Sequence, residues 1–180
     1  MDKQYLEKQI RQNIWGTGSA ERDFLPLYAD RVNFDLIAQY LAEPYRGLVD
    51  FVAAPESLGY ILGSKLAGEL GVGFAAIRGA DHYHILEDKL LSASYIDHYD
   101  RVRSVVMRRD LIPAHSRVLL VDDWIGTGVT MQACLTLLEE AEAYPAGIAA
   151  LGMDKCVADK GIIPGSMVHC VYLRGRSCRL

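Results

Sequence analysis

The apolar positions of the first 45 residues recur with helical spacing. Residues 2–15 place Leu6, Ile10 and Ile14 four residues apart, which puts them on one face of a helix. Residues 29–43 repeat the pattern until Pro44 stops it. The residues expected on the inner face of this second helix are Val32, Leu36, Ile37, Tyr40 and Leu41. The pattern therefore predicts a helical segment at the N-terminus.

From residue 46 onward, short apolar runs alternate with further helical patterns. Runs typical of buried strands cover residues 48–54, 74–78, 118–121, 146–151 and 167–173, and residues 101–107 alternate as a half-exposed strand does. Helices are expected over residues 57–70 and 129–143, and the polar residues 79–93 are expected to form a long loop. Strands alternating with helices predict an α/β fold with a mostly parallel central sheet flanked by helices.

We predict one domain over residues 1–180, in which residues 1–45 form a small helical hood and residues 46–180 form the core. In sheets of this class, ligands bind at the carboxyl ends of the strands. That rule brings residues 55–60, 78–79 and 122–130 together at one edge of the sheet.

Composition limits the function classes. The 180 residues are 51% hydrophobic, enough for a packed core, and the net charge of −4 gives no overall basic field for nucleic acid. No apolar run approaches the ~18 residues of a membrane span, and the charged N-terminus lacks a signal-peptide pattern. The four cysteines lack metal-site spacing and are expected to be free thiols. We therefore expect a cytoplasmic protein without nucleic-acid or membrane partners.

The most specific signal is VLLVDDWIGTGVT, residues 118–130. An apolar strand ends in two carboxylates, Asp122 and Asp123, which are good acceptors for paired ribose hydroxyls. A glycine-rich loop then exposes backbone N–H groups, Thr127 and Thr130 add hydroxyls, and the next helix presents its N-terminus. These features predict a site for a ribose 5-phosphate group.

Two commoner phosphate motifs do not fit this segment. A P-loop needs Gly-Lys-Ser/Thr, and the segment has no lysine. A dinucleotide fingerprint needs a third glycine where Met131 stands, and its acid follows the glycines by about 20 residues. Here the acids come before the glycines.

The segment resembles the phosphoribosyl-pyrophosphate motif of type I phosphoribosyltransferases, and the resemblance extends over roughly residues 20–155. Within that family the pattern is most similar to the adenine enzymes. Their "ESRGF" corresponds to ESLGY at residues 56–60, "LGVPFVPVRK" to LGVGFAAIRG at residues 70–79, and "SYxLEYG" to SYIDHYD at residues 94–100.

The resemblance implies the transfer of a 5-phosphoribosyl group from phosphoribosyl pyrophosphate to a purine or purine-like base, as in purine salvage. Asp122 and Asp123 would bind the ribose hydroxyls and Mg²⁺, and a homodimer is the usual assembly. Residues 79–95 would be a flexible loop that closes over the reactants, with Ser94 and Tyr95 at its end. The residues implied for the 5-phosphate are Ile125, Gly126, Thr127, Gly128, Val129 and Thr130. Those implied for pyrophosphate are Glu56, Ser57, Leu58, Gly59, Tyr60 and Arg78.

The chain departs from the family pattern at three positions. Leu58 stands where the family has Arg, and Gly79 stands where Lys is usual, so two cations near pyrophosphate are missing. His98 stands where the adenine enzymes carry Glu, and is a candidate general acid near the base. These changes motivate the alternative of a non-catalytic, ligand-sensing protein of the same fold.

Several other polar and aromatic residues have two interpretations. His82 and His84 are solvated loop residues or substrate contacts, and Lys89 is a surface lysine or reaches pyrophosphate on closure. Trp124 either stacks on the acceptor ring or packs against the adjoining helix. A basic cluster either forms exposed strand charges or a dimer contact, or it supplies cations for pyrophosphate across a dimer interface. Its members are Arg101, Arg103, Arg108 and Arg109.

Overall fold

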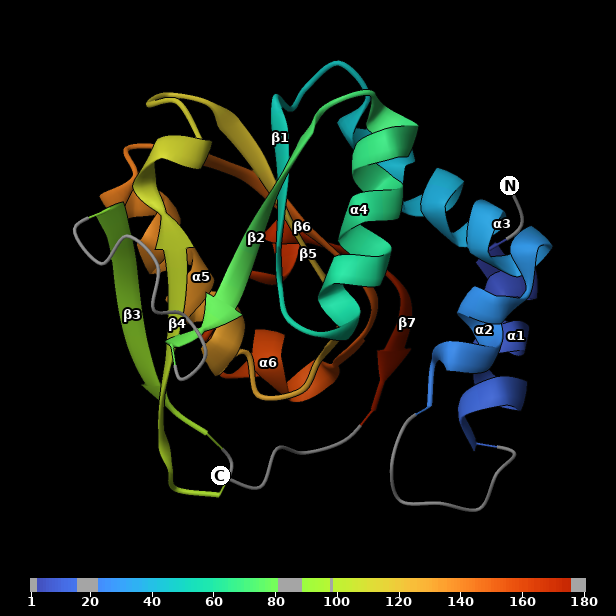
Figure 1. Ribbon diagram of the computed structural model, residues 1–180. Coiled ribbons are helices and arrows are strands. Elements are labelled where there is room, and N and C mark those ends of the chain that lie inside the picture. The colour runs from blue at the N-terminus through green and yellow to red at the C-terminus, as the bar shows by residue number, and fades with distance from the viewer. Residues whose placement is uncertain (1–2, 16–22, 81–88, 98, 176–180) are drawn as a thin grey trace.

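The computed structural model describes residues 3–15, 23–80, 89–97 and 99–175. Its centre is a seven-stranded sheet with the order β3-β4-β2-β1-β5-β6-β7 (Figure 1). Neighbouring strands among β2, β1, β5, β6 and β7 pair in parallel, and β3 and β4 form an antiparallel hairpin whose β4 pairs with β2. The strands are β1 (Phe51–Pro55), β2 (Gly73–Gly79), β3 (Leu90–Ile96), β4 (Val102–Arg108), β5 (Arg117–Ile125), β6 (Tyr144–Asp154) and β7 (Val168–Arg174).

Helices cover both faces of the sheet. One face packs against α1 (Lys3–Trp15), α2 (Leu25–Ala29), α3 (Arg31–Ala42) and α4 (Leu58–Leu70), and the other against α5 (Val129–Glu140) and α6 (Lys155–Asp159). The 3₁₀ turns are η1 (Glu43–Tyr45), η4 (Arg109–Leu111) and η5 (Gly165–Met167). The mostly parallel α/β fold expected from the sequence is confirmed, because each face of the sheet buries its own apolar cluster.

The helical spacing at the N-terminus is confirmed for most inward positions. Leu6 and Ile10 of α1 are buried, as are Ile37 and Leu41 of α3. Val32 is 55% exposed, so its expected inward position is wrong. It lies in the first turn of α3, on the far side of the helix from the stripe that faces the sheet.

The segment expected as a loop over residues 79–93 contains the start of a strand. Residues 90–93 belong to β3, which pairs with β4 through seven consecutive register partners from Leu90 and Arg108 to Ile96 and Val102. The expected flexible loop over residues 79–95 therefore includes ordered hairpin at its end. Its residues 81–88 lie outside the described residues, as do His82 and His84.

The helices and the cysteines test two further expectations from the sequence. No helix among the described residues is long and apolar enough to cross a membrane. Cys134 and Cys170 are free thiols, whereas Cys156 is disulfide-bonded, so the expectation of free thiols is wrong at Cys156. Spacing along the chain does not report which cysteines meet in space.

Candidate functional site

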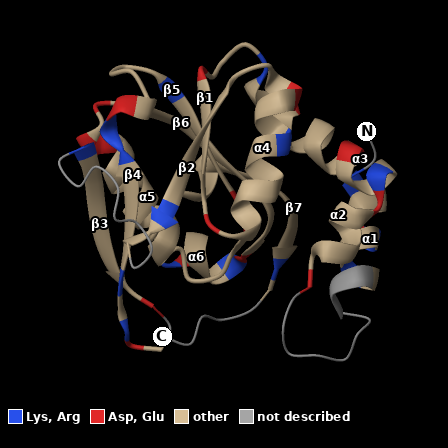
Figure 2. Cartoon of the chain, in the orientation of Figure 1, with Lys and Arg blue, Asp and Glu red and all other residues tan. Residues whose placement is uncertain are grey.

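The carboxyl ends of β1, β2 and β5 form one edge of the sheet, the lower edge in Figure 1. Strand pairing brings Pro55 of β1 beside Ile77 of β2, and Ala53 beside Leu120 of β5. The segments that follow these strands therefore meet, as the sequence predicted. Figure 2 shows basic residues at the carboxyl end of β2 and along β4 near the hairpin end, close to this edge.

Two carboxylates stand at the end of β5. The backbone N–H of Asp123 donates to Oδ1 of Asp122 at 2.9 Å. Burial and then the neighbouring Asp123 carboxylate raise the pKa of Asp122 well above its usual range. Gly59 permits the first turn of α4 to approach, since a Cβ there would lie 3.2 Å from Asp122 Oδ1. The Asp122 carboxylate thus lies close to the first turn of α4.

The loop after β5, residues 126–130, leads into α5 through a glycine that no other residue replaces easily. Gly128 is the N-cap residue of α5 and has φ +86°. A Cβ at Gly128 would also lie 2.9 Å from Val157 Cγ1. The first N–H groups of α5 have no partner within the helix, and the N-terminal end of a helix favours an anion. We call residues 126–130 the phosphate loop.

The turn between β1 and α4, residues 56–60, is tied to β2. The N–H of Glu56 donates to the carbonyl of Ile77 at 3.0 Å, and the hydroxyl of Tyr60 donates to the same carbonyl at 2.8 Å. Glu56 Oε1 accepts from the N–H of Gly79 at 2.9 Å, and Glu56 Oε2 lies 3.7 Å from Nε of Arg78. The expected cation Arg78 is therefore next to a carboxylate.

Two cavities open beside these segments and share part of their lining. A cavity of about 330 Å³ is lined by the phosphate loop and the hairpin end, and one of about 230 Å³ by the turn 56–60 and the middle of the hairpin. The lining residues common to both are Tyr95, Arg103 and Thr130. The two regions expected to hold different phosphates are therefore neighbours.

The structure places both residues expected at the end of the flexible loop on β3. Tyr95 lines both cavities. Ser94 lines neither, but its hydroxyl lies 2.8 Å from that of Ser104, which lines the smaller cavity. Lys89 lies 3.9 Å from Asp110, which fits the expected surface role. The candidate general acid His98 lies outside the described residues.

The side chains of three expected binding residues do not face the cavities. Ile125 is buried in the core between the sheet and α5, Leu58 packs against the core under α4, and Tyr60 spans to β2. These three positions can offer backbone groups to a ligand. Thr127, Val129 and Thr130 do line the larger of the two cavities.

Sequence reasoning missed Tyr28, a residue of α2. Its hydroxyl is buried, and no described residue forms a hydrogen bond with it. Burial and then the negative charges of Asp123 and Asp122 raise the pKa of Tyr28. A buried hydroxyl that lacks a partner among the described residues and senses two carboxylates is a candidate for contact with a ligand. A single Tyr in a short helix carries no sequence pattern that would have identified it.

Trp124 follows the two carboxylates and packs within the protein. It is 7% exposed, its ring stacks 6.0 Å from that of Phe24, and its Nε1–H donates to Oδ1 of Asp154 at 3.2 Å. Trp124 thus packs inside the protein, but against Phe24 and Tyr172 and not against the adjoining helix α5, whose buried residues lie in the other apolar cluster.

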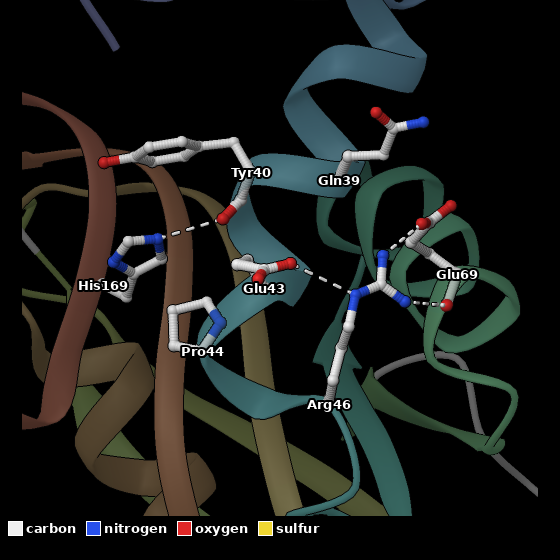
Figure 3. A pocket seen from close by; sticks show the side chains of 7 residues that line it. All are labelled: Gln39, Tyr40, Glu43, Pro44, Arg46, Glu69 and His169. Carbon is white, nitrogen blue, oxygen red and sulfur yellow. Dashed lines mark hydrogen bonds and ion pairs between the residues drawn. The ribbon is translucent and has the colours of Figure 1, made fainter. Parts of the chain in front are cut away.

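Another pocket, of about 570 Å³, is lined by residues from the C-terminal ends of α3 and α4, from η1 and from β7 (Figure 3). Arg46 there donates to both Glu43 and Glu69, and His169 meets the carbonyl of Tyr40 at 3.2 Å. The arginine of this pocket is thus paired with two carboxylates, and the residues that the sequence singled out as candidate site residues do not line it.

A family model described as "Phosphoribosyl transferase domain" matches residues 28–159. The adenine phosphoribosyltransferase of Streptococcus uberis is 35% identical over 144 residues, covering 78% of this chain and 80% of that protein. That of Renibacterium salmoninarum is 33% identical over 155 residues, covering 81% of each chain.

Solved structures agree with these sequence matches. The adenine phosphoribosyltransferase of Rhodothermus marinus superposes with a TM-score of 0.82 at 27% identity, covering 95% of this chain and 99% of that one. The enzyme of Saccharomyces cerevisiae, solved with an imino-altritol bisphosphate and adenine, gives 0.77 at 26% identity, covering 93% and 99%. The matched region includes every segment that lines the two cavities.

Proposed function

Since this chain belongs to the phosphoribosyltransferase family, we propose how the residues at its sheet edge carry out the family's reaction. The protein is an enzyme that transfers the 5-phosphoribosyl group of phosphoribosyl pyrophosphate to a purine base and releases pyrophosphate. The observation that carries this assignment is the position of the Asp122–Asp123 pair between the phosphate loop and the turn 56–60. The relatives favour this enzyme over a non-catalytic protein of the same fold.

We place the co-substrate along this edge. The ribose hydroxyls donate to Asp122 and Asp123, and the 5-phosphate accepts from the N–H groups and hydroxyls of the phosphate loop. The diphosphate extends to the turn 56–60, where Arg78 lies beside Glu56. Neighbouring cavities of about 330 and 230 Å³ support a ligand with phosphates at two ends.

The proposed cofactor is Mg²⁺, bound by Asp122 and Asp123. No cluster of three or more His, Cys, Asp or Glu residues occurs among the described residues, so substrate oxygens would complete the ligand set. Two carboxylates with phosphate and water oxygens are the donors that Mg²⁺ takes. A metal held there would supply positive charge to offset that of the departing diphosphate.

In the reaction, the bond from the anomeric carbon to the pyrophosphate oxygen breaks, and a bond to a ring nitrogen of the base forms. Positive charge develops on the ribose ring during this exchange, as in an oxocarbenium ion. Asp122 and Asp123 are placed to hold the ring in position and to stabilise that charge. The nitrogen loses its proton, and His98 is the proposed group for proton transfer at the base.

The acceptor is the substrate that the sequence departures affect most. Adenine is the acceptor named for the relatives at 33–35% identity. We propose a purine acceptor on this basis, with adenine as the first base to test. His98 in place of the family's Glu is the feature of this chain that would alter the choice among purines.

The test is a pyrophosphate-release assay with phosphoribosyl pyrophosphate, Mg²⁺ and a panel of adenine, hypoxanthine, guanine and other nitrogen heterocycles. We expect one purine to give turnover well above the rest, and chelation of Mg²⁺ to abolish it. Binding of phosphoribosyl pyrophosphate without turnover on any base would contradict the proposed reaction.

We also propose that the protein forms a homodimer. Ile96 and Val102, register partners at the hairpin end, are 61% and 74% exposed, which supports burial in a homodimer. Light scattering on the purified protein tests this.

The charged co-substrate does not cross membranes unaided, which supports a cytoplasmic location. Cell fractionation tests that location.

A further inference from the structure

One arginine of the hairpin lies between the two regions assigned to phosphates. Arg103 lines the cavity that contains Thr127 and Thr130, and it also lines the cavity that contains Glu56 and Gly79. Its place follows from strand pairing, since Arg103 is the register partner of Tyr95 and paired residues share a face of the hairpin. A long cationic side chain at this position can reach both regions.

The turn 56–60 needs a cation from elsewhere. The family pattern has Arg where this chain has Leu58, and Lys where it has Gly79. The space at Gly79 is taken by a carboxylate, because a Cβ there would lie 2.8 Å from Oε1 of Glu56. Arg78, the cation at this turn, lies 3.7 Å from the other oxygen of Glu56. The turn 56–60 thus carries less positive charge for a diphosphate than the Arg and Lys of the family pattern would provide.

Arg103 is held in place by an organised carboxylate. Its Nε–H donates to Oδ2 of Asp97 at 3.2 Å, and Oδ1 of Asp97 accepts from the N–H groups of Tyr99 and Arg101. Burial alone would raise the pKa of Asp97. The hydrogen bonds outweigh this effect and lower the pKa, which keeps the carboxylate charged. The Arg103 side chain remains 42% exposed, and a guanidinium in a fixed orientation suits bidentate binding of phosphate.

We propose that Arg103 binds the diphosphate group of phosphoribosyl pyrophosphate, supplying the positive charge that Leu58 and Gly79 do not. This inference rests on the proposed function. Arg103 lies outside the family motifs that are matched at residues 56–60, 70–79, 94–100 and 118–130. Arg101 is the weaker candidate. It lines only the cavity at the phosphate loop, and its guanidinium lies over the ring of Tyr99 at 4.9 Å.

The test compares Arg103→Gln with Arg108→Gln. Arg108 lies on the same strand and is also paired with a carboxylate, Asp110, but it lines neither cavity. Inorganic pyrophosphate, phosphoribosyl pyrophosphate and ribose 5-phosphate are each titrated into the folded proteins by calorimetry in the presence of Mg²⁺. Arg103→Lys is measured as well, since it keeps the charge and loses the planar fork.

We expect Arg103→Gln to weaken pyrophosphate and phosphoribosyl pyrophosphate roughly tenfold or more, the loss of a charge-assisted hydrogen bond. Ribose 5-phosphate should change by less than about threefold, Arg103→Lys should show a smaller loss, and Arg108→Gln should match the wild type. A merely structural role would weaken all three ligands alike.

Two results would overturn the inference while leaving the proposed function intact. One is unchanged pyrophosphate affinity in Arg103→Gln, and the other is an equal loss for ribose 5-phosphate. If the wild-type protein binds neither pyrophosphate nor phosphoribosyl pyrophosphate, the proposed function fails together with the inference.

Discussion

At the scale of single residues, the hydroxyl of Tyr28 gives a test that separates binding from stability. A buried hydroxyl without a partner destabilises the ligand-free protein. Tyr28→Phe should therefore leave the free energy of unfolding unchanged or raise it by about 1 kcal/mol, while weakening substrate binding. Urea unfolding and calorimetry measure the two effects.

Tyr45→Phe is the matched control for this variant. The hydroxyl of Tyr45 is also buried, but it donates to the carbonyl of Ile148 at 3.2 Å. Its removal should lower the free energy of unfolding by about 1 kcal/mol and leave binding unchanged. If the two variants behave alike in both measurements, Tyr28 has no special relation to the ligand.

Asp123 gives the second prediction at the scale of residues. Asp123→Asn keeps the shape of the side chain but removes the charge that we propose accepts the ribose hydroxyl. Binding of phosphoribosyl pyrophosphate should weaken by about 1–3 kcal/mol, the contribution of a charge-assisted hydrogen bond. Asp159→Asn, at an exposed position of α6, is the control with the same change of charge. Equal affinity in the wild type and Asp123→Asn would remove Asp123 from the site.

At the scale of elements, Gly128 determines how β5 passes into α5. Gly128→Ala places a Cβ at φ +86° and 2.9 Å from Val157 Cγ1. We expect a loss of about 1–3 kcal/mol in the free energy of unfolding, with weaker binding of ribose 5-phosphate because the loop shifts. Thermal unfolding with and without ribose 5-phosphate measures both.

The control is a glycine in a regular helix. Gly68 of α4 has nothing within 4 Å of an added Cβ, and its φ is not in the left-handed region. Gly68→Ala should raise the free energy of unfolding by roughly 0.5–1 kcal/mol, since alanine is the better helix former. A stable, fully binding Gly128→Ala variant would show that the loop does not need this backbone conformation.

At the scale of the whole molecule, the sequence predicted the sheet edge because its signal is local. Apolar runs ending in Pro55, Arg78 and Asp122 define strand ends, and parallel pairing then brings those ends together. The strand β3 was missed because its buried positions, Leu91 and Ala93, alternate with serines and give a weak pattern. Its structure depends on pairing with β4.

The same reason separates the candidate site residues that the sequence singles out from those that it does not. Asp122, Asp123 and the phosphate loop are contiguous, so their pattern can be recognised in the sequence. Tyr28 comes from α2, whose distance from Asp122 along the chain hides their electrostatic interaction. Arg103 is one of four arginines that the sequence suggests for pyrophosphate, and only its pairing with Tyr95 across the hairpin distinguishes it from the other three. Such contacts between distant segments depend on the fold, which no local pattern states.

The last prediction concerns a buried ion pair that joins three strands and the hood. Arg174 of β7 donates to Asp154 of β6, with Nε–Oδ1 at 2.6 Å, and Asp154 also accepts from Trp124 of β5, whose ring stacks on Phe24 of the hood. The Arg174 and Asp154 side chains are only 15% and 11% exposed.

Arg174→Gln leaves a buried carboxylate without its cation and should lower the free energy of unfolding by about 3 kcal/mol. The fluorescence of Trp124 should shift to the red as water reaches its ring. In the double variant Arg174→Met, Asp154→Leu, most of the lost stability should return, because removing both charges removes the unpaired one. Arg46→Gln, at a more exposed ion pair, should cost less than about 1 kcal/mol. If Arg174→Gln costs no more than Arg46→Gln, the pair does not hold the hood and the three strands together.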